Sequence, residues 1–236
     1  MGPMRRFLLC LLLLVAPALA AAQQRVALEL VLAIDTSTSV SAGEFTLQQE
    51  GLARAFEHPE VQAAIAALGA TGMAVQIVHW AGRGQQAVSV PWMRVNDPAS
   101  ARALAARIRA APRRLRGFTD IAGALRFSAA AFAGNGYRGA RRVIDISGDG
   151  TASAADPAAA RDRALAAGIT INGLVILSDE VDLEALADRI IIAHYRERVI
   201  GGPGAFVMVA DGFEDFPGAM HRKLVREILG MVVAGR

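Results

Sequence analysis

Cysteine is almost absent from the sequence, and its single occurrence, Cys10, lies in an N-terminal apolar segment. We interpret that segment as part of a signal peptide, so no cysteine remains once it is removed. No disulfide can then stabilise the protein in an oxidising compartment. Its stability must come from a hydrophobic core and from any metal that it binds.

The first 20 residues have the pattern of a secretory signal. Two arginines precede an apolar run at residues 7–15, and small residues follow, as at an Ala-x-Ala cleavage site. That run is short for a membrane span, which needs roughly 20 residues. Cleavage after Ala20 fits the pattern, and cleavage after Ala22 fits almost as well. We therefore expect a periplasmic or secreted protein with no transmembrane segment after cleavage.

A strong excess of one charge is also missing. The signal segment takes two of the 25 basic residues, so residues 21–236 carry 23 basic against 22 acidic side chains. This balance gives no electrostatic reason to expect nucleic-acid binding. Internal repeats, long charge runs and linkers are absent as well, and the length suits one full core. We expect residues 21–236 to form a single domain.

Short apolar strands alternate with helical patterns along this domain. Such alternation predicts parallel βαβ units in a three-layer α/β fold with helices on both faces of the sheet. Two neighbouring strands with only a short, glycine-containing turn between them predict one antiparallel hairpin near an edge. The expected strands are 26–34, 73–80, 87–95, 142–147, 169–177 and 205–210; the expected helices are 41–57, one from 59, 98–110, 120–133 with Thr119 as its cap, 153–168, 182–194 and 217–233.

Oxygen-bearing side chains gather where these strands and helices meet. Ligand sites in open α/β sheets form beyond the carboxyl ends of strands, at the point where the strand order reverses. If the first and fourth strands are neighbours there, their loops come together with the start of a middle helix. The residues that would meet are Asp35, Ser37, Ser39, Thr119 and Asp149.

This set of atoms favours a particular class of cation. Two carboxylates at close range repel each other, and one of them takes a raised pKa unless a cation lies between them. Ligands that are all oxygen suit Mg²⁺ or Mn²⁺, with Ca²⁺ also possible, and they do not suit zinc or copper. Hydroxyls carry no charge, so the cation would keep an affinity for a further anion.

Three segments of the chain resemble the von Willebrand factor type A domain: "DTSTS" at 35–39, "GFTDIAGAL" at 117–125 and "DISGDG" at 145–150. The likeness covers nearly all of the mature chain. It is greatest to a group of uncharacterised secreted bacterial proteins of that fold, whose ends resemble "GPGAFVMVADGFEDF" at 202–216. The resemblance implies a metal-ion-dependent adhesion site (MIDAS), with Asp35, Ser37, Ser39 and Thr119 as ligands and Asp149 acting directly or through water.

The same resemblance implies a function in binding rather than catalysis. We expect a metal-dependent protein-binding module whose partner offers an Asp or Glu to the cation, and we expect no enzymatic activity. The family usually reads Thr-Asp-Gly after the fourth strand, where this chain has an extra glycine. Asp145 therefore stays open as the second acid of the site, beside its interpretation as a buried structural carboxylate paired with an arginine or with backbone.

Two other functions are weighed against this one. The first is an aspartate-dependent phosphatase of the haloacid dehalogenase type, but Ser37 stands where such enzymes need an acid, and the only lysine, Lys223, lies in the last helix. The second is a scaffold of this fold with a non-functional metal site. We interpret the arginines at 113, 114 and 116 as a charged rim or a solvated loop. The four histidines show no pairing at metal-ligand spacing, so we interpret them as surface or core residues.

Overall fold

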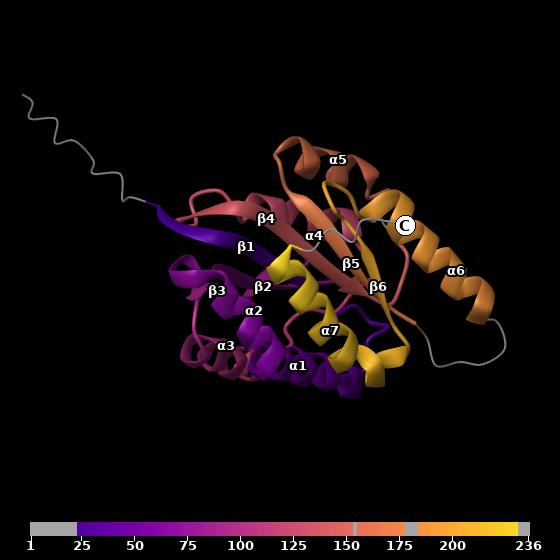
Figure 1. Cartoon of the computed structure of the whole chain (residues 1–236). Helices are drawn as coiled ribbons and strands as arrows, with labels where there is room; N and C mark the ends of the chain where they lie inside the picture. Colours follow the sequence, from indigo (N-terminus) through magenta and orange to yellow (C-terminus); the bar gives the residue numbers. More distant parts are fainter. Residues whose placement is uncertain (1–22, 153–154, 178–183, 231–236) are drawn as a thin grey trace, which may run out of the picture.

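Six strands and the helices between them make up the part of the chain that the computed structural model describes, residues 23–152, 155–177 and 184–230 (Figure 1). The predicted signal peptide and the predicted helix end at Val233 lie outside these residues. The strands are β1 (Gln24–Asp35), β2 (Met73–Trp80), β3 (Gln86–Val95), β4 (Tyr137–Gly148), β5 (Thr170–Ile176) and β6 (Val207–Ala210). The helices are α1 (Ala42–Glu57), α2 (Pro59–Ala67), α3 (Pro98–Ala110), α4 (Ile121–Ala130), α5 (Ala158–Ala166), α6 (Glu184–His194) and α7 (Gly212–Leu229), with a 3-10 turn η1 (Gly69–Thr71) and a π-helix η2 (Tyr195–Val199).

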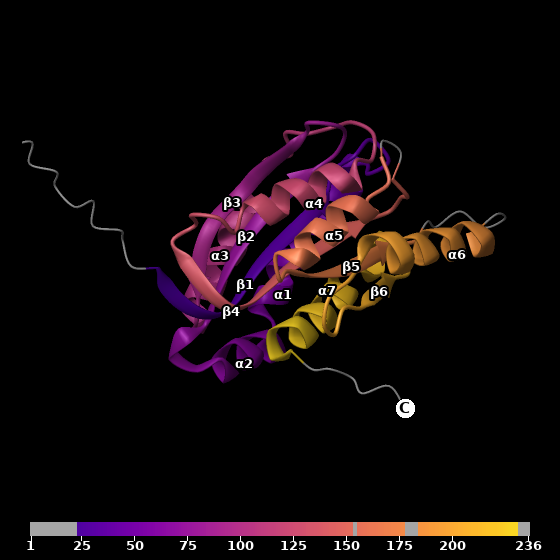
Figure 2. The same cartoon turned by 90° about the horizontal axis from the view of Figure 1, so that it is seen from above.

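The sheet has the order β3-β2-β1-β4-β5-β6, and its strands are parallel except for the antiparallel β2–β3 hairpin. The predicted fold class and the predicted hairpin are thus confirmed. The chain builds outward from β1 to β2 and β3 and then crosses to β4 on the other side of β1. The strand order therefore reverses between β1 and β4, whose following loops lie at the same end of the sheet (Figure 2).

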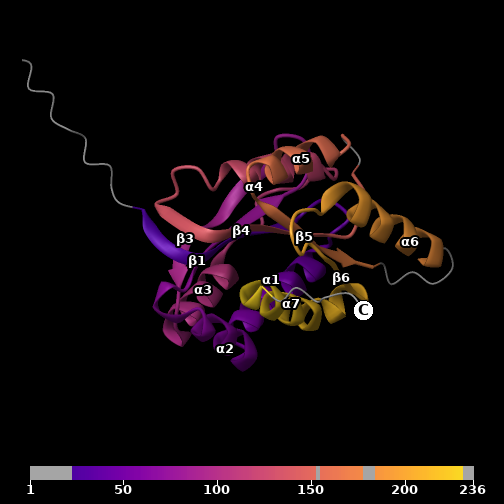
Figure 3. The ribbon, with the colours of Figure 1, turned by 45° about the horizontal axis from the view of Figure 1, so that its top comes forward.

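Helices cover both faces of the sheet (Figure 3). The helices α1, α2, α3 and α7 pack on one face, and α4, α5 and α6 pack on the other. Strand β1 shows why both faces are covered: Leu30 and Leu32 are buried in the first core, whereas Val31 and Ala33 are buried in the second. Successive side chains of a strand point to opposite faces, so a strand that is apolar at every position needs a core on each side.

Local sequence signals explain most of the helix boundaries. The predicted capping box at α1 is present: the Ser41 hydroxyl accepts from the Glu44 N–H at 3.2 Å, and the Glu44 carboxylate accepts from the Ser41 N–H at 2.6 Å. The predicted start of the last helix at Pro217 is wrong, because α7 begins at Gly212. The apolar stripe that includes Phe213 and Phe216 is already buried against the sheet before the proline, and this packing extends the helix in that direction.

Candidate metal centre

Asp35 is the last residue of β1, and its side chain is completely buried. Its Oδ1 atom accepts a 2.7 Å hydrogen bond from the Ser37 N–H. The Ser37 and Ser39 hydroxyls lie 3.0 Å apart, and Ser39 Oγ donates to Asp149 Oδ1 at 2.9 Å. The loops after β1 and β4 therefore meet, as expected for a ligand site at the point where the strand order reverses.

The two threonines of the "DTSTS" loop have a different role from its serines. Thr36 is buried, and its hydroxyl donates to the Trp80 carbonyl at 3.0 Å. Thr38 donates to the Gly117 carbonyl through both its N–H, at 2.9 Å, and its hydroxyl, at 3.2 Å. The threonines thus attach the loop to neighbouring segments.

The Arg113 side chain stabilises the same loop through hydrogen bonds to its backbone. Its Nη2 donates to the carbonyls of Thr36, Ser37 and Val40 at 3.1, 2.8 and 2.6 Å, and its Nη1 donates to the Ser41 carbonyl at 3.0 Å. The interpretation of Arg113 as part of a solvated loop is therefore wrong. Its charge does act on the site, because it opposes the rise in the pKa of Asp35. Its guanidinium group binds the carbonyls on the inner side of the turn and so stabilises the conformation of the loop.

Thr119 and Asp149 lie at the open side of the cluster, and both are half-buried. A Cβ atom added at Gly150 would lie 3.7 Å from Thr119 Oγ1, which places the threonine hydroxyl beside the loop after β4. The prediction that Thr119 caps the following helix is wrong. Asp120 is the N-cap of α4, and its Oδ1 accepts from the Gly123 N–H at 2.9 Å. Because Asp120 does the capping, Thr119 belongs to the loop and not to the helix.

The second carboxylate oxygen of Asp35 is the unusual atom of the site. Asp35 Oδ2 is buried and has no hydrogen-bond partner among the described residues. Burial first, and then the nearby Asp149 charge, raise the pKa of Asp35 from 3.8 to about 7. Burial also raises the pKa of Asp149. Unpaired buried carboxylates are costly, so this pair of acids requires either a proton or a cation.

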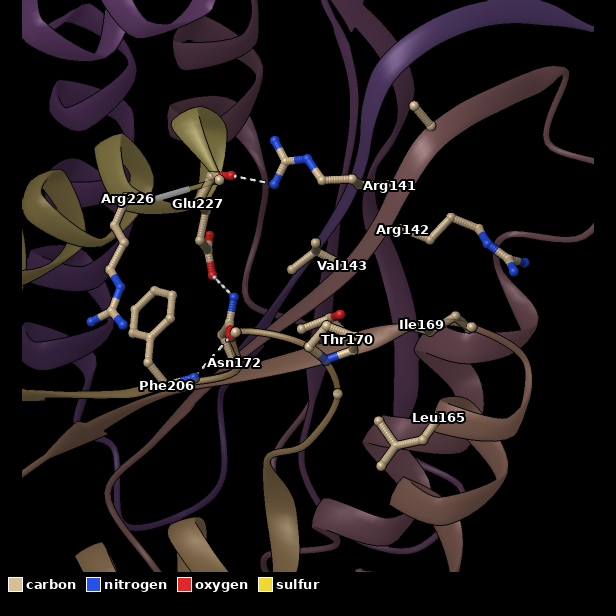
Figure 4. Close-up of a pocket in the computed structure, with 16 residues that line it drawn as sticks. Arg141, Arg142, Val143, Leu165, Ile169, Thr170, Asn172, Phe206, Arg226 and Glu227 are labelled. Atoms are coloured by element: carbon tan, nitrogen blue, oxygen red, sulfur yellow. Dashed lines mark hydrogen bonds between the residues drawn. The ribbon is translucent and has the colours of Figure 1, made fainter. Parts of the chain in front are cut away.

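Asp145, the alternative acid, is directed elsewhere. It lies within β4, and its Oδ1 is 2.9 Å from the ammonium of Lys223 on α7, which is also 2.6 Å from Glu227. Asn172 donates to Glu227 at 3.0 Å and accepts from the Phe206 N–H at 3.1 Å (Figure 4). The interpretation as a buried structural carboxylate is therefore correct, but the partner is the lysine and not an arginine or the backbone.

A cavity of about 390 Å³ lies beyond that network, near the amino ends of β4 and β5 (Figure 4). Arg141 and Arg226 line it, but Arg141 donates to the carbonyls of Glu227 and Ile228, and Arg226 stacks on the Phe206 ring at 3.8 Å. None of the predicted site residues lines this cavity. The cavity and the oxygen cluster are thus separate features near opposite ends of the sheet.

The family model for proteins of unknown function named DUF1194 matches residues 25–232 of this chain. The chain belongs to the DUF1194 family. No curated protein matches it significantly. The predicted likeness to an uncharacterised family is thereby confirmed.

Solved structures similar to this DUF1194 protein share its fold. Proximal thread matrix protein 1 from the mussel byssus, solved with a zinc-occupied MIDAS motif, has a TM-score of 0.64 at 15% identity over 87% of this chain and 48% of its own. The pilus adhesin SpaC of Lactobacillus rhamnosus GG has a TM-score of 0.62 at 14% identity, over 86% of this chain and 31% of its own. BatB of Bacteroides thetaiotaomicron has a TM-score of 0.52 at 14% identity, over 86% of this chain and 100% of its own. The DUF1194 chain thus spans less than half of the first two proteins.

The residues of the DUF1194 site fit a hard divalent cation. The candidate ligands are oxygens of two carboxylates and three hydroxyls, which suit Mg²⁺, Mn²⁺ or Ca²⁺. The unpartnered Asp35 Oδ2 and the raised pKa of Asp35 indicate that the cluster lacks a positive charge. A Cβ atom at Gly148 would lie 2.9 Å from Asp35 Oδ2, so the glycine is what leaves this oxygen enough space.

Sequence reasoning missed two residues of this site. The Tyr195 hydroxyl is buried without a hydrogen-bond partner in the described part of the chain, and the Gly148 Cβ position would be 2.8 Å from it. Burial, followed by the charges of Asp35 and Asp149, raises the pKa of Tyr195. Tyr195 begins the π-helix η2 inside an apolar pattern that gives no hint of a site, although π-helical turns often occur at functional positions. Gly148 was visible only as the extra glycine of "SGDG".

Proposed function

We propose that this protein is a periplasmic or secreted module that binds a partner protein through a divalent cation. Asp35, Ser37, Ser39, Thr119 and Asp149 would hold the cation, Mg²⁺ or Mn²⁺, and a carboxylate of the partner would complete its coordination. The single observation that carries this proposal is the buried, unpartnered Asp35 Oδ2 inside a cluster made only of oxygens.

The chain's own residues account for the selectivity for an anion. When bound, the cation supplies a positive centre with an open position for an oxygen ligand. Two carboxylates balance a divalent ion formally, but the three hydroxyls add no charge. With Asp149 held by Ser39 and acting through water, the cation would keep an affinity for a further anion. The hydrogen bonds of Arg113 go to loop carbonyls, so the carboxylates stay available to the cation, and its nearby charge offsets only part of their repulsion. A partner Asp or Glu is the side chain that fits such a centre.

The surface around the site supports a protein partner. Phe118, next to Thr119, is 80% exposed, which is unusual for a large apolar side chain. Arg114 and Arg116 are exposed in the same loop. An aromatic side chain beside positive charges suits a partner that combines an acidic residue with apolar contacts.

A binding role is also the better proposal than the phosphatase alternative. Lys223 is fully buried and paired with Asp145 and Glu227, so it is in no position to act on a substrate at Asp35. A binding role is also supported by the similar solved structures, which include a pilus adhesin and a byssus matrix protein. Export would rest on the predicted signal peptide. In the residues that the structure covers, no helix has the length and apolar character needed to cross a bilayer.

The test is capture of a partner from envelope extract on immobilised protein. We expect retention in Mn²⁺ by the wild type, release by EDTA, and no retention by Asp35→Ala or Thr119→Ala. Matched controls are Asp162→Ala and Thr46→Ala, which remove an exposed carboxylate and an exposed hydroxyl elsewhere. A partner that is retained equally with EDTA and by both site variants would contradict recognition through a metal.

A further inference from the structure

The structure brings together two histidines that the sequence gave no reason to pair. His58 and Glu60 lie at the junction of α1 and α2, and His221 lies on α7. The possible ligand atoms of these three side chains all lie within 4.8 Å of one another. His221 Nε2 is 3.0 Å from Glu60 Oε2, and the two imidazole rings have centroids 3.7 Å apart at an interplanar angle of 37°. His58 and His221, which show no pairing in the sequence, are thus in contact in the structure.

Rigid elements hold the three side chains. His58 ends α1 and begins α2 as its N-cap, where Nδ1 accepts a long hydrogen bond of 3.3 Å from the Glu60 N–H. Pro59 fixes the first turn of α2, and α7 packs against both α1 and α2. The Glu60 side chain is 68% exposed and free to rotate, whereas His221 is only 20% exposed. The site is thus largely formed, and solvent can reach it.

The chemistry of this group differs from that of the oxygen cluster. Two imidazoles and one carboxylate are a ligand set that zinc takes in proteins, with a water in the fourth position. Tetrahedral zinc with bonds of about 2.0–2.1 Å needs ligand atoms roughly 3.3 Å apart. To reach that spacing, the exposed Glu60 side chain would rotate and His58 would give up both its long cap bond and its stacking on His221.

The two sites are also far apart. Helix α1 begins beside the oxygen cluster and ends at His58, and its 16 residues span about 24 Å. A substitution at one site can therefore be made without disturbing the ligands of the other. We propose that His58, Glu60 and His221 form a second metal site, which binds zinc or another borderline divalent cation and joins α7 to the α1–α2 junction.

The test is zinc titration of the full protein in excess Mg²⁺, which occupies oxygen sites but competes poorly for imidazole. We expect one zinc per chain in the wild type and the same affinity in Asp35→Ala, which disables only the oxygen cluster. His58→Ala, His221→Ala and Glu60→Gln should each lose at least about 100-fold in affinity, since loss of an outer-shell partner alone costs 10–100-fold. His194→Ala is the matched control, because His194 lies on another element, and it should bind zinc as the wild type does.

Glu60→Gln keeps the test valid if a histidine variant fails to fold, because its side chain is exposed and changes by one atom. Cobalt gives a second measurement, since a four-coordinate Co²⁺ spectrum in the wild type and in Asp35→Ala would locate the ion among the histidines. Zinc affinity that is unchanged in the His58→Ala/His221→Ala double variant would overturn the proposal. Zinc that is lost only in Asp35→Ala would overturn it as well, and would assign the ion to the oxygen cluster.

Discussion

Asp35 and Asp145 are both fully buried carboxylates on neighbouring strands, yet their surroundings differ. Asp145 has the Lys223 ammonium 2.9 Å away, supplied by α7 from within the fold. Asp35 Oδ2 has no hydrogen-bond partner among the described residues. Arg113 acts on Asp35 only as a nearby charge, and it does not cancel the effects of burial and of the second carboxylate, Asp149. Where this fold needs an internal counter-charge it provides one, so the lack of one at Asp35 points to a cation from outside.

The buried charges around Asp145 balance one another without an external ion. Lys223 serves two acids, and burial together with the Glu227 charge raises the pKa of Asp145 well above its usual range. With one proton shared between the two carboxyls, the ammonium leaves no net charge, and Asn172 donates to Glu227. The contrast with Asp35 lies in this counter-charge and not in hydrogen bonds, because both oxygens of Asp145 also lack a hydrogen-bond partner among the described residues. A buried group of this kind is sensitive to the removal of one member, because the others are left uncompensated.

Removal of Lys223 should therefore have the largest effect on stability. We expect Lys223→Met to lower the free energy of unfolding by about 3–5 kcal/mol, the usual cost of breaking a buried ion pair on one side. Urea denaturation at pH 7 measures it. The triple variant Asp145→Asn/Lys223→Met/Glu227→Gln should recover part of the loss, because it leaves no buried charge. A loss of less than about 1 kcal/mol in Lys223→Met would show that Asp145 does not depend on Lys223 as its counter-charge.

Removal of the Asp35 charge should have the opposite sign. In EDTA at pH 8 we expect Asp35→Asn to unfold at higher urea than the wild type, with a gain of about 2 kcal/mol, because an unpaired buried charge is lost. Asp145→Asn is the matched control and should give no such gain, because the carboxyl that it removes already has the Lys223 ammonium beside it. If Asp35→Asn were strongly destabilised instead, Asp35 would be a structural ion-pair member, and its need for an external cation would no longer follow.

The ionisation of Asp35 should also make the stability of the metal-free protein depend on pH. The folded pKa of Asp35 is raised from 3.8 to about 7, so between these values the folded state holds a proton that the unfolded state has released. The free energy of unfolding must therefore fall as pH rises from about 4 to 7, at a fraction of the limit of about 1.4 kcal/mol per pH unit. Urea melts across this range should lose most of that slope in Asp35→Asn. An equal slope in both proteins would assign it to other groups.

The smallest effect is expected at Thr119. Asp120 caps α4, so Thr119→Ala keeps the helix cap, and we expect it to lower metal-free stability by about 1 kcal/mol or less, the usual worth of one hydrogen bond. Its effect should appear in Mn²⁺, where a ten-fold excess over Kd stabilises the wild type by about 1.4 kcal/mol. The variant should need several-fold more Mn²⁺ for the same rise in melting temperature. A Mn²⁺ response identical to that of the wild type would remove Thr119 from the site.

The parallel sheet and the hairpin could be predicted because local patterns determine them. Apolar strands that alternate with helices require parallel units, and the short glycine-containing turn before β3 requires a hairpin. That β1 and β4 are neighbours was only a condition of the prediction; the structure meets it and so brings Asp35 and Asp149 together. The capping box at Ser41 and Glu44 marked the start of α1 for the same reason, since both partners lie within one turn.

Features that depend on distant side chains could not be predicted. The Asp145–Lys223 pair and the meeting of His58 with His221 join segments far apart in sequence, and no local pattern reports which way those side chains point. The role of Arg113 depends on the carbonyl directions of a turn. Asp120 rather than Thr119 caps α4, although the two neighbouring residues are both good caps.

The position of Mn²⁺ in an anomalous difference map of the soaked wild-type crystal tests the central claim most directly. The account predicts one strong peak at the carboxyl end of β1, within about 2.0–2.3 Å of the Ser37 and Ser39 hydroxyls, next to Asp35 and Asp149, and no such peak in Asp35→Ala. A map from wild-type protein in saturating Mn²⁺ with no peak there, or with its only peak elsewhere, would contradict it.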